Sequence, residues 1–211
     1  MISIWQDDDQ MEPVKRKLLQ AALLEFAEKG YEGGSTNQIV QSAGVSKGML
    51  FHLFSNKKTL FLAVVDACIA YFFAYLDGRL KELSDDLLER LLQIQRVKME
   101  LFAEEPHLYR MAVSTFIDCP AGCRDEIKAR EAEFNERYFS LFLNDVDTSK
   151  WREQLDVKQS LSFILAAIEA LTQKHVRDQS QARYRGLERL ALFQEEIGAF
   201  CDMIRYGLYK Q

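Results

Sequence analysis

Residues 35–60 read STNQIVQSAGVSKGMLFHLFSNKKTL, and this stretch decides the fold of the first part of the chain. Two helical segments flank Ala-Gly-Val at positions 43–45, where a small alanine lets helix axes approach and glycine supplies positive φ for a sharp turn. Ser35, with Gln38 three residues later, has the spacing of a capping box, and Ser46 is placed as the N-cap of the second segment. The stretch therefore predicts a helix-turn-helix.

One face of this unit is apolar and the other is polar. The residues predicted to form its small core are Ile39, Val40, Val45, Leu50 and Phe54. The residues left pointing outward are Asn37, Lys47, Met49 and His52. A short helix exposed in this way can enter the major groove of DNA with its N-terminal residues at base edges.

Local charge agrees with this interpretation, although the net charge of the chain, −5, gives no global attraction to nucleic acid. Between Gly33 and Val65 there are three lysines and no Asp or Glu, in a chain with 32 acidic residues. Such a gap marks a surface that does not repel phosphate. The alternative is a plain packing corner, and the coincidence of caps, glycine turn and acid-free stretch favours DNA binding.

Residues 19–60 resemble the TetR family of bacterial transcriptional regulators. The resemblance is carried by Ala21-Ala22, Phe26, Gly30-Tyr31, Ser35-Thr36, Ile39, Ala43-Gly44-Val45-Ser46, Gly48, Leu50-Phe51, Phe54, Lys57 and Leu60. It implies that Thr36 and Lys57 contact phosphates and that His52 lies at the groove margin. It also places Asn37, Lys47, Gly48 and Met49 near base edges.

The full set of expected DNA-binding residues is Ser35, Thr36, Asn37, Ser46, Lys47, Gly48, Met49, Phe51, His52 and Lys57. Two positions depart from the family pattern. Phe51 stands where tyrosine is usual, so a phosphate-binding hydroxyl is absent, and Leu53 stands where tyrosine or histidine is frequent.

The rest of the chain is helical by its apolar spacing, and no segment alternates as a strand does. The predicted helices run from Pro13 to Gly30, from Asn56 to about Leu80, and over about 85–103, 106–117, 120–143, 157–175 and 187–209, besides the two of the helix-turn-helix. The fold class expected is all-α, with about nine helices. A disordered acidic tail (1–11) precedes a three-helix DNA-binding domain (12–56) and a larger helical bundle for ligand binding and dimerisation (57–211).

The resemblance implies that the second domain encloses an apolar ligand pocket and forms a homodimer through its last two helices. The sequence agrees in part, because residues 161–171 and a stripe from Leu190 to Ile204 give each of these helices an apolar face. From the pattern alone, the two helices could pack within one chain or across a twofold axis.

Polar or aromatic residues among apolar ones are the candidates for the pocket. They are His107, Arg110, Phe116, Phe134, Tyr138, Phe163 and Glu169. Aromatic residues at helical spacing are more often core, and Arg110 is more simply solvated. Glu169 is the strongest candidate, because burying an unpaired carboxylate is costly. The expected effector is a small apolar or amphipathic molecule, cationic if Glu169 is buried.

Other function classes find little support. Residues 44–48 (GVSKG) match a nucleophile elbow by letters, but that elbow needs a preceding strand. Glu104 and His107 match Glu-x-x-His once, with Pro106 between them. No catalytic residue, metal site or cofactor is predicted, and a redox role for Cys119 and Cys123 is left open. A DNA-organising protein that senses no ligand remains an alternative to the regulator.

Residues 60–76 are apolar apart from Asp66, which could suggest a membrane span. The charge inside the segment and its short length favour a helix buried at the centre of a bundle, with no membrane contact. The expected location is the cytoplasm, because no secretory signal precedes the helices and the cysteines are expected to be reduced.

Overall fold

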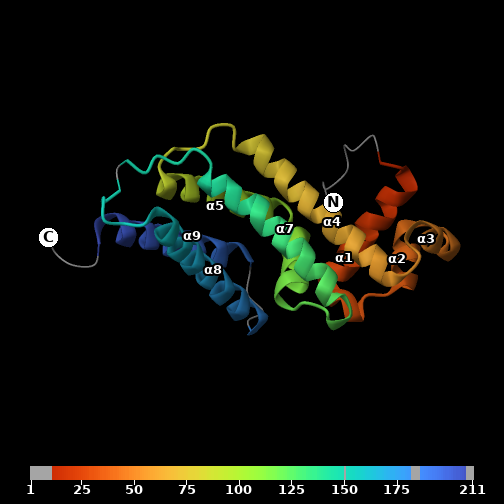
Figure 1. Cartoon of the computed structure of the whole chain (residues 1–211). Coiled ribbons are helices and arrows are strands. Elements are labelled where there is room, and N and C mark those ends of the chain that lie inside the picture. Colours follow the sequence, from red (N-terminus) through yellow and green to blue (C-terminus); the bar gives the residue numbers. More distant parts are fainter. Residues whose placement is uncertain (1–10, 150, 182–185, 208–211) are drawn as a thin grey trace. The chain divides into compact units, whose positions relative to one another are not determined.

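The computed structural model describes residues 11–149, 151–181 and 186–207. Within these ranges the chain forms nine α-helices, two short helical turns and no strand (Figure 1). The all-α prediction is therefore confirmed. The predicted acidic tail falls almost entirely outside the described residues.

The first four helices are α1 (Pro13–Gly33), α2 (Thr36–Ala43), α3 (Lys47–Phe54) and α4 (Lys57–Arg79). Pro13 occupies the first turn of α1, where its missing N–H is not needed. Gly30 leaves the helical conformation with φ 66° and ψ −179°, a combination open almost only to glycine. The regular part of α1 ends there, as the sequence predicts.

A buried carboxylate joins α1 to the start of α2. The Glu25 side chain on α1 is buried, and its Oε1 accepts a hydrogen bond from the backbone N–H of Ser35 at 3.0 Å. Lys29, one turn later, donates to both carboxylate oxygens of Glu25. The first backbone donors of a helix have no partner inside it, so Glu25 satisfies a group that would otherwise be buried unpaired.

This contact corrects the predicted capping box. The Ser35 hydroxyl does cap α2, accepting from the N–H of Gln38 at 3.4 Å. The reciprocal bond from the Gln38 side chain to the N–H of Ser35 does not form, because Glu25 takes that donor and the Gln38 amide donates to Ser42 instead. Glu25 lies ten residues earlier in the chain, and its role is not visible in the local pattern.

Helix α4 is long and apolar enough to cross a membrane by length and composition alone. Its large apolar residues point inward: the buried set is Leu60, Phe61, Val64, Val65, Cys68, Phe72, Phe73 and Leu76. Its exposed positions are small or polar, and they include Asp66 and Asp77. This distribution is typical of a core helix and agrees with the sequence interpretation.

The remaining α-helices are α5 (Leu87–Glu104), α6 (Pro106–Ala112), α7 (Arg124–Leu143), α8 (Val157–Gln181) and α9 (Gly186–Tyr206). A π-helical turn, η1 (Val113–Ile117), extends α6 to the predicted end of that segment, and a 3-10 turn, η2 (Ala121–Cys123), precedes α7. The structure carries α8 beyond the predicted limit near residue 175. The break between α5 and α6 falls at Glu105, so Glu104 and His107 do not share one helix.

The chain divides into two compact units. Unit 1 comprises Met1–Gly78 and Glu104–Arg137, and unit 2 comprises Arg79–Ala103 and Tyr138–Gln211. The helix-turn-helix shares unit 1 with most of α4, with α6 and with the first part of α7. The boundaries of the two compact units therefore differ from the domain boundary predicted between residues 56 and 57. That domain boundary stays a prediction.

The core of unit 1 near the helix-turn-helix is aromatic. Phe26 on α1 packs edge-to-face on Phe61 of α4, with ring centroids 5.1 Å apart, and Tyr31 lies 4.9 Å from Phe61. Aromatic pairs in such arrangements contribute beyond their buried area. They fix α1 against the first turns of α4.

Unit 2 is organised around Arg90, a buried arginine on α5. Its guanidinium donates to the backbone carbonyls of Ser84, at 2.6 Å, and of Leu141, Asn144 and Asp145. Ser84 precedes α5, Leu141 lies in the last turn of α7, and the other two residues follow that helix. Arg90 thus holds the end of α7 beside α5, around the apolar core of the unit.

We predict that Glu25→Ala destabilises the protein by about 1–3 kcal/mol, because the substitution leaves the N–H of Ser35 without its acceptor. Urea denaturation followed by circular dichroism measures the effect. The matched control is Glu28→Ala on the same helix, where the side chain is exposed. Equal midpoints for the two variants would contradict the role given to Glu25.

Candidate nucleic-acid interface

Helix α3 presents one face to the core and leaves its start exposed. The Ser46 hydroxyl caps the helix by accepting from the N–H of Met49 at 3.2 Å, as predicted. Leu50 and Phe54, one turn apart, are buried. The exposed residues are Lys47, Gly48, Met49, Phe51 and His52. This leaves the N-terminal end of α3 accessible, as entry into a major groove requires.

The turn between α2 and α3 has the predicted geometry. Gly44 adopts a left-handed conformation with φ 65° and ψ 35°, and its N–H bonds back to the end of α2. Ile39 is fully buried, whereas Val40 and Val45 are only half-buried and contribute less to the small core than predicted. Asn37 is exposed on the polar face of α2, beside the half-buried Ser35 and Thr36.

Two lysines of the interface keep their charge free of carboxylate partners among the described residues. The Lys47 ammonium lies 5.9 Å from the centroid of the Phe51 ring, one turn along α3. The Lys57 ammonium lies 4.9 Å from the centroid of the Tyr31 ring and donates to the carbonyl of Glu32 at 3.1 Å. Both charges remain available to phosphate. The substitution of phenylalanine at position 51 removes a hydroxyl but supplies a ring on which Lys47 rests.

The third lysine of the acid-free stretch is paired with an acidic residue from a distant part of the chain. Lys58 forms an ion pair with Glu126 of α7 at 2.6 Å, and this hydrogen bond lowers the pKa of the Glu126 carboxyl. The two residues are far apart in the sequence, so the local pattern could not reveal the pair. The basic surface therefore rests on Lys47 and Lys57.

Lys58–Glu126 is one of three ion pairs that join α4 to α7 within unit 1. Asp66 accepts from Arg130 through both carboxylate oxygens, with 2.8 Å between Oδ2 and Nη2. Asp77 accepts from Arg137 at 3.1 Å. Partly exposed ion pairs contribute little net stability, so their main effect is to set the register of the two helices.

Comparison with known proteins agrees with this geometry. Residues 18–64 match the family described as "Bacterial regulatory proteins, tetR family". The chain is 26% identical over 165 residues to the HTH-type transcriptional repressor KstR2 of Mycolicibacterium smegmatis, across 74% of this chain and 78% of the relative. The N-terminal segment therefore matches the TetR family, and most of the chain is similar to a transcriptional repressor. The protein is a DNA-binding transcriptional regulator.

Solved structures of TetR-like regulators show that the fold extends beyond the matched segment. The fatty acid degradation regulator FadR from Bacillus halodurans superposes with a TM-score of 0.67 at 16% identity, over 95% of this chain and 99% of that one. FadR from Bacillus subtilis in complex with stearoyl-CoA superposes with a TM-score of 0.60 at 17% identity, over 92% and 99%. At these identities the likeness concerns the fold alone.

The structure distributes the predicted pocket residues between the two units of this regulator. His107, Arg110, Phe116 and Phe134 belong to unit 1, and Tyr138, Phe163 and Glu169 belong to unit 2. Phe116 and Phe134 lie together, with ring centroids 6.0 Å apart. Phe134 also contacts Phe72 and Phe73 of α4.

The other candidates differ in their surroundings. His107 is half-buried, its Nδ1 is buried without a partner, and burial lowers its pKa. Arg110 is exposed, in line with the simpler interpretation, and Phe163 is 66% exposed in the single chain. The side chain of Glu169 lies outside the described residues.

The cysteine pair left open by the sequence consists of free thiols. Cys119 is half-buried and Cys123 is buried, and burial raises the pKa of the Cys123 thiol. A raised pKa reduces the thiolate fraction that redox chemistry and metal binding need. Among the described residues, no group of three or more potential metal ligands comes together.

Sequence reasoning missed one polar group in unit 2. Lys98 on α5 is half-buried beside the ring of Tyr138 on α7, and burial lowers its pKa to about 8. In the sequence Lys98 occupies an ordinary polar position of an amphipathic helix. Its burial arises from α7 and α9, which pack over it from distant parts of the chain.

The first prediction concerns Lys47 and Lys57. Replacing either with alanine should weaken binding to a DNA duplex, and Lys57→Ala should also reduce the slope of log affinity against log salt by about 0.9, because it removes one phosphate contact. Fluorescence anisotropy at several salt concentrations measures the slope. The control, Lys81→Ala at an exposed position in unit 2, should leave it unchanged. A slope unaltered by Lys57→Ala would remove that residue from the phosphate-binding set.

The second prediction concerns Lys98. Its pKa is about 8 in the folded protein and 10.5 without burial, so folding at neutral pH buries a charge at a cost. Lys98→Met should therefore raise the urea midpoint at pH 7. The advantage should shrink between about pH 8 and 10.5, where the folded wild type has lost its proton and the unfolded chain has not. An advantage independent of pH would show that burial of the charge is not its cause.

Proposed function

We propose that this regulator is a repressor that binds a palindromic operator as a homodimer in the cytoplasm and leaves it when a small apolar or amphipathic effector binds. The observation that carries the proposal is the exposed start of α3, flanked by the free charges of Lys47 and Lys57. An exposed helix start beside unpaired lysines matches the geometry and charge of a DNA major groove with its bordering phosphates.

The proposed contacts divide into two kinds. Thr36 and Lys57 contact phosphates and set the register of the protein on the duplex, as do the hydroxyls of Ser35 and Ser46 that also cap the helices. Asn37, Lys47, Gly48 and Met49 reach base edges, and Phe51 and His52 lie at the margin of the groove. Phe51 offers no hydroxyl to phosphate, so its own contacts at that margin are apolar.

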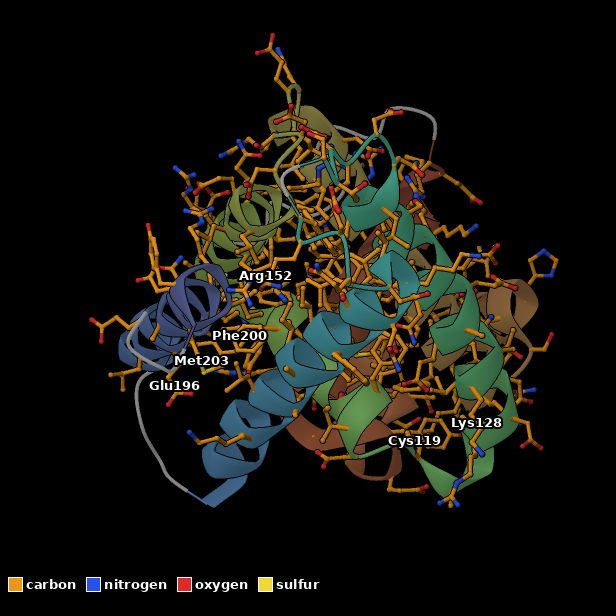
Figure 2. All side chains as sticks on the ribbon, turned by 60° about the vertical axis from the view of Figure 1, so that its left-hand side comes forward. Cys119, Lys128, Arg152, Glu196, Phe200 and Met203 are labelled. Carbon is orange, nitrogen blue, oxygen red and sulfur yellow. The ribbon has the colours of Figure 1, made fainter. Side chains whose placement is uncertain are left out.

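Apolar side chains exposed on α8 and α9 support the homodimer. Phe163 on α8 is followed at helical spacing by the exposed alanines 166 and 170. Met203, labelled in Figure 2, is exposed on α9, and Leu192 and Ala199 are exposed earlier on the same helix. A second copy of the chain would cover both faces in a four-helix arrangement, with the small alanines permitting close approach.

The apolar stripe predicted on α9 contributes mainly to the core of unit 2. Phe193 and Ile197 are buried in the core of unit 2, so they do not reach a partner. The face left for dimerisation is the adjoining one, with Leu192 and Met203, and Ile204 is exposed at the C-terminal end of the buried stripe. A twofold axis relating two copies would match the symmetry of a palindrome.

Helix α7 provides a route from the effector to the DNA. It runs unbroken from Arg124 in unit 1 to Leu143 in unit 2. Three ion pairs join it to α4, the helix that follows the helix-turn-helix. An effector that shifts α7 also shifts α4 and with it the separation of the two recognition helices. A preference of about 1–3 kcal/mol for the released state gives a useful switch.

An effector with an apolar chain fits the composition of the second unit. Its core contains buried Leu, Ile, Met and Phe side chains from α5, α7, α8 and α9. The FadR neighbour bound to stearoyl-CoA is an example of the same fold holding a long acyl chain. A DNA-organising protein without an effector remains the second candidate, and a thermal shift that depends on both a ligand and DNA separates the two. No enzymatic role is proposed.

Selection from a pool of random duplexes tests the operator part of the proposal. We expect enriched sequences to form an inverted repeat, with half-sites separated by about one helical turn or a multiple of it. Sedimentation of the complex should give two chains, or a multiple of two, per duplex. An enriched motif without symmetry, bound by a single chain, would contradict the homodimer, and enrichment of no motif would favour the DNA-organising alternative.

A further inference from the structure

Lys98 in unit 2 is a positively charged residue that lies beside two aromatic rings. No acidic side chain among the described residues pairs with it. The Lys98 ammonium lies 5.7 Å from the centroid of the Tyr138 ring and 5.9 Å from that of Phe193 on α9. It lies 3.4 Å from the Tyr138 hydroxyl. Among the described residues it forms no ion pair, and burial without one is what lowers its pKa to about 8.

A second polar group points to the same place. Gln95 precedes Lys98 by three residues, so both side chains lie on one face of α5. Its side chain is buried, with 3% of the residue exposed, and its Nε2 donates weakly to the Tyr138 hydroxyl at 3.5 Å. Its Oε1 is buried without a partner. Because Oε1 accepts and does not donate, the atom of Gln95 that can reach an anion is Nε2.

The chemistry of these three groups suits the acidic end of an amphipathic molecule. An ammonium supplies the charge, and an amide and a phenol supply hydrogen bonds to oxygen. The cost of burying Lys98 is recovered when an anion arrives, because a charge pair in an apolar setting is far stronger than one in water. The buried aliphatic residues of the same core, among them Ile94, Ile164 and Ile197, offer surroundings for an apolar tail.

We propose that Lys98, Gln95 and Tyr138 form the anion-binding end of the effector site, and that the effector is an acyl-chain molecule with an anionic head. The inference rests on the proposed ligand response of this regulator and names the class of ligand. It replaces the cationic effector that a buried Glu169 would favour. A carboxylate and a phosphate share this chemistry, and the test below distinguishes them.

Three probes with the same twelve-carbon chain test the site: dodecanoate, dodecyl phosphate and 1-dodecanol, each below its aggregation limit in titration calorimetry. We expect the full-length protein to bind one of the two anions more tightly than the alcohol. Lys98→Met should weaken binding of that anion by about 30-fold or more, as loss of one partner of a buried charge pair does. Binding of the alcohol should be unaltered. The stronger of the two anions identifies the head group.

Two controls make the result decisive. Lys81→Met, at an exposed position of the same unit, should bind all three probes like the wild type. Lys98→Arg keeps the charge and should retain a preference for the anion over the alcohol. Equal affinity of Lys98→Met and the wild type for both anions, or no preference of the wild type for either anion over the alcohol, would overturn the site.

DNA binding in the presence of the same probes separates the site from the proposed regulation. An anion that binds through Lys98 yet leaves DNA affinity unchanged would support the site and contradict the proposed release. A compound that releases DNA equally from the wild type and Lys98→Met would support the release and contradict the site.

Discussion

The hydrogen bond from Ser35 to the buried carboxylate of Glu25 is the contact on which the placement of the recognition unit depends. Helices α2 and α3 are eight residues each, too short to hold a fixed direction by themselves. Glu25 fixes the start of α2 to α1, and Gly44 then sets the turn into α3. The Phe26–Phe61 contact fixes α1 against α4. The exposed end of α3 therefore has one orientation within unit 1.

Rigidity at the recognition end contrasts with the polar connections along α4. The contacts between α4 and α7 include three ion pairs, at least partly exposed, that can shift at small cost. In the proposed mechanism, a change around Tyr138 reaches Arg137 through α7, which runs unbroken from Arg124 to Leu143. A ligand-released regulator needs a fixed DNA-binding helix together with helix contacts that can shift.

Much of unit 1 could be predicted because its signals are local. The caps at Ser35 and Ser46, the turn at Gly44 and the helix end at Gly30 each depend on residues within a few positions of one another. The role of Glu25 and the pair between Lys58 and Glu126 depend on tertiary contact, so neither has a local signal in the sequence. The acid-free stretch was therefore a true feature of the chain, while only two of its three lysines remain unpaired in space.

Unit 2 was less predictable for the same physical reason. Aromatic residues at helical spacing look alike whether they line a pocket or fill a core, so the predicted pocket set came to lie in both units. Lys98 and Gln95 are ordinary polar residues in the sequence of α5, and only the fold brings them to Tyr138 on α7. Burial, which makes them chemically interesting, is a property of the fold and not of the local sequence.

The central claim is that the start of α3 reads a major groove in each half of a symmetric site. Dimethyl sulfate protection on the selected operator tests it directly, because the reagent methylates guanine N7 in the major groove and adenine N3 in the minor groove. The account predicts protection of guanine N7 in two major grooves on one face of the duplex, with adenine N3 still reactive between them. Protection confined to adenine N3, or guanines fully reactive in the saturated complex, would contradict it.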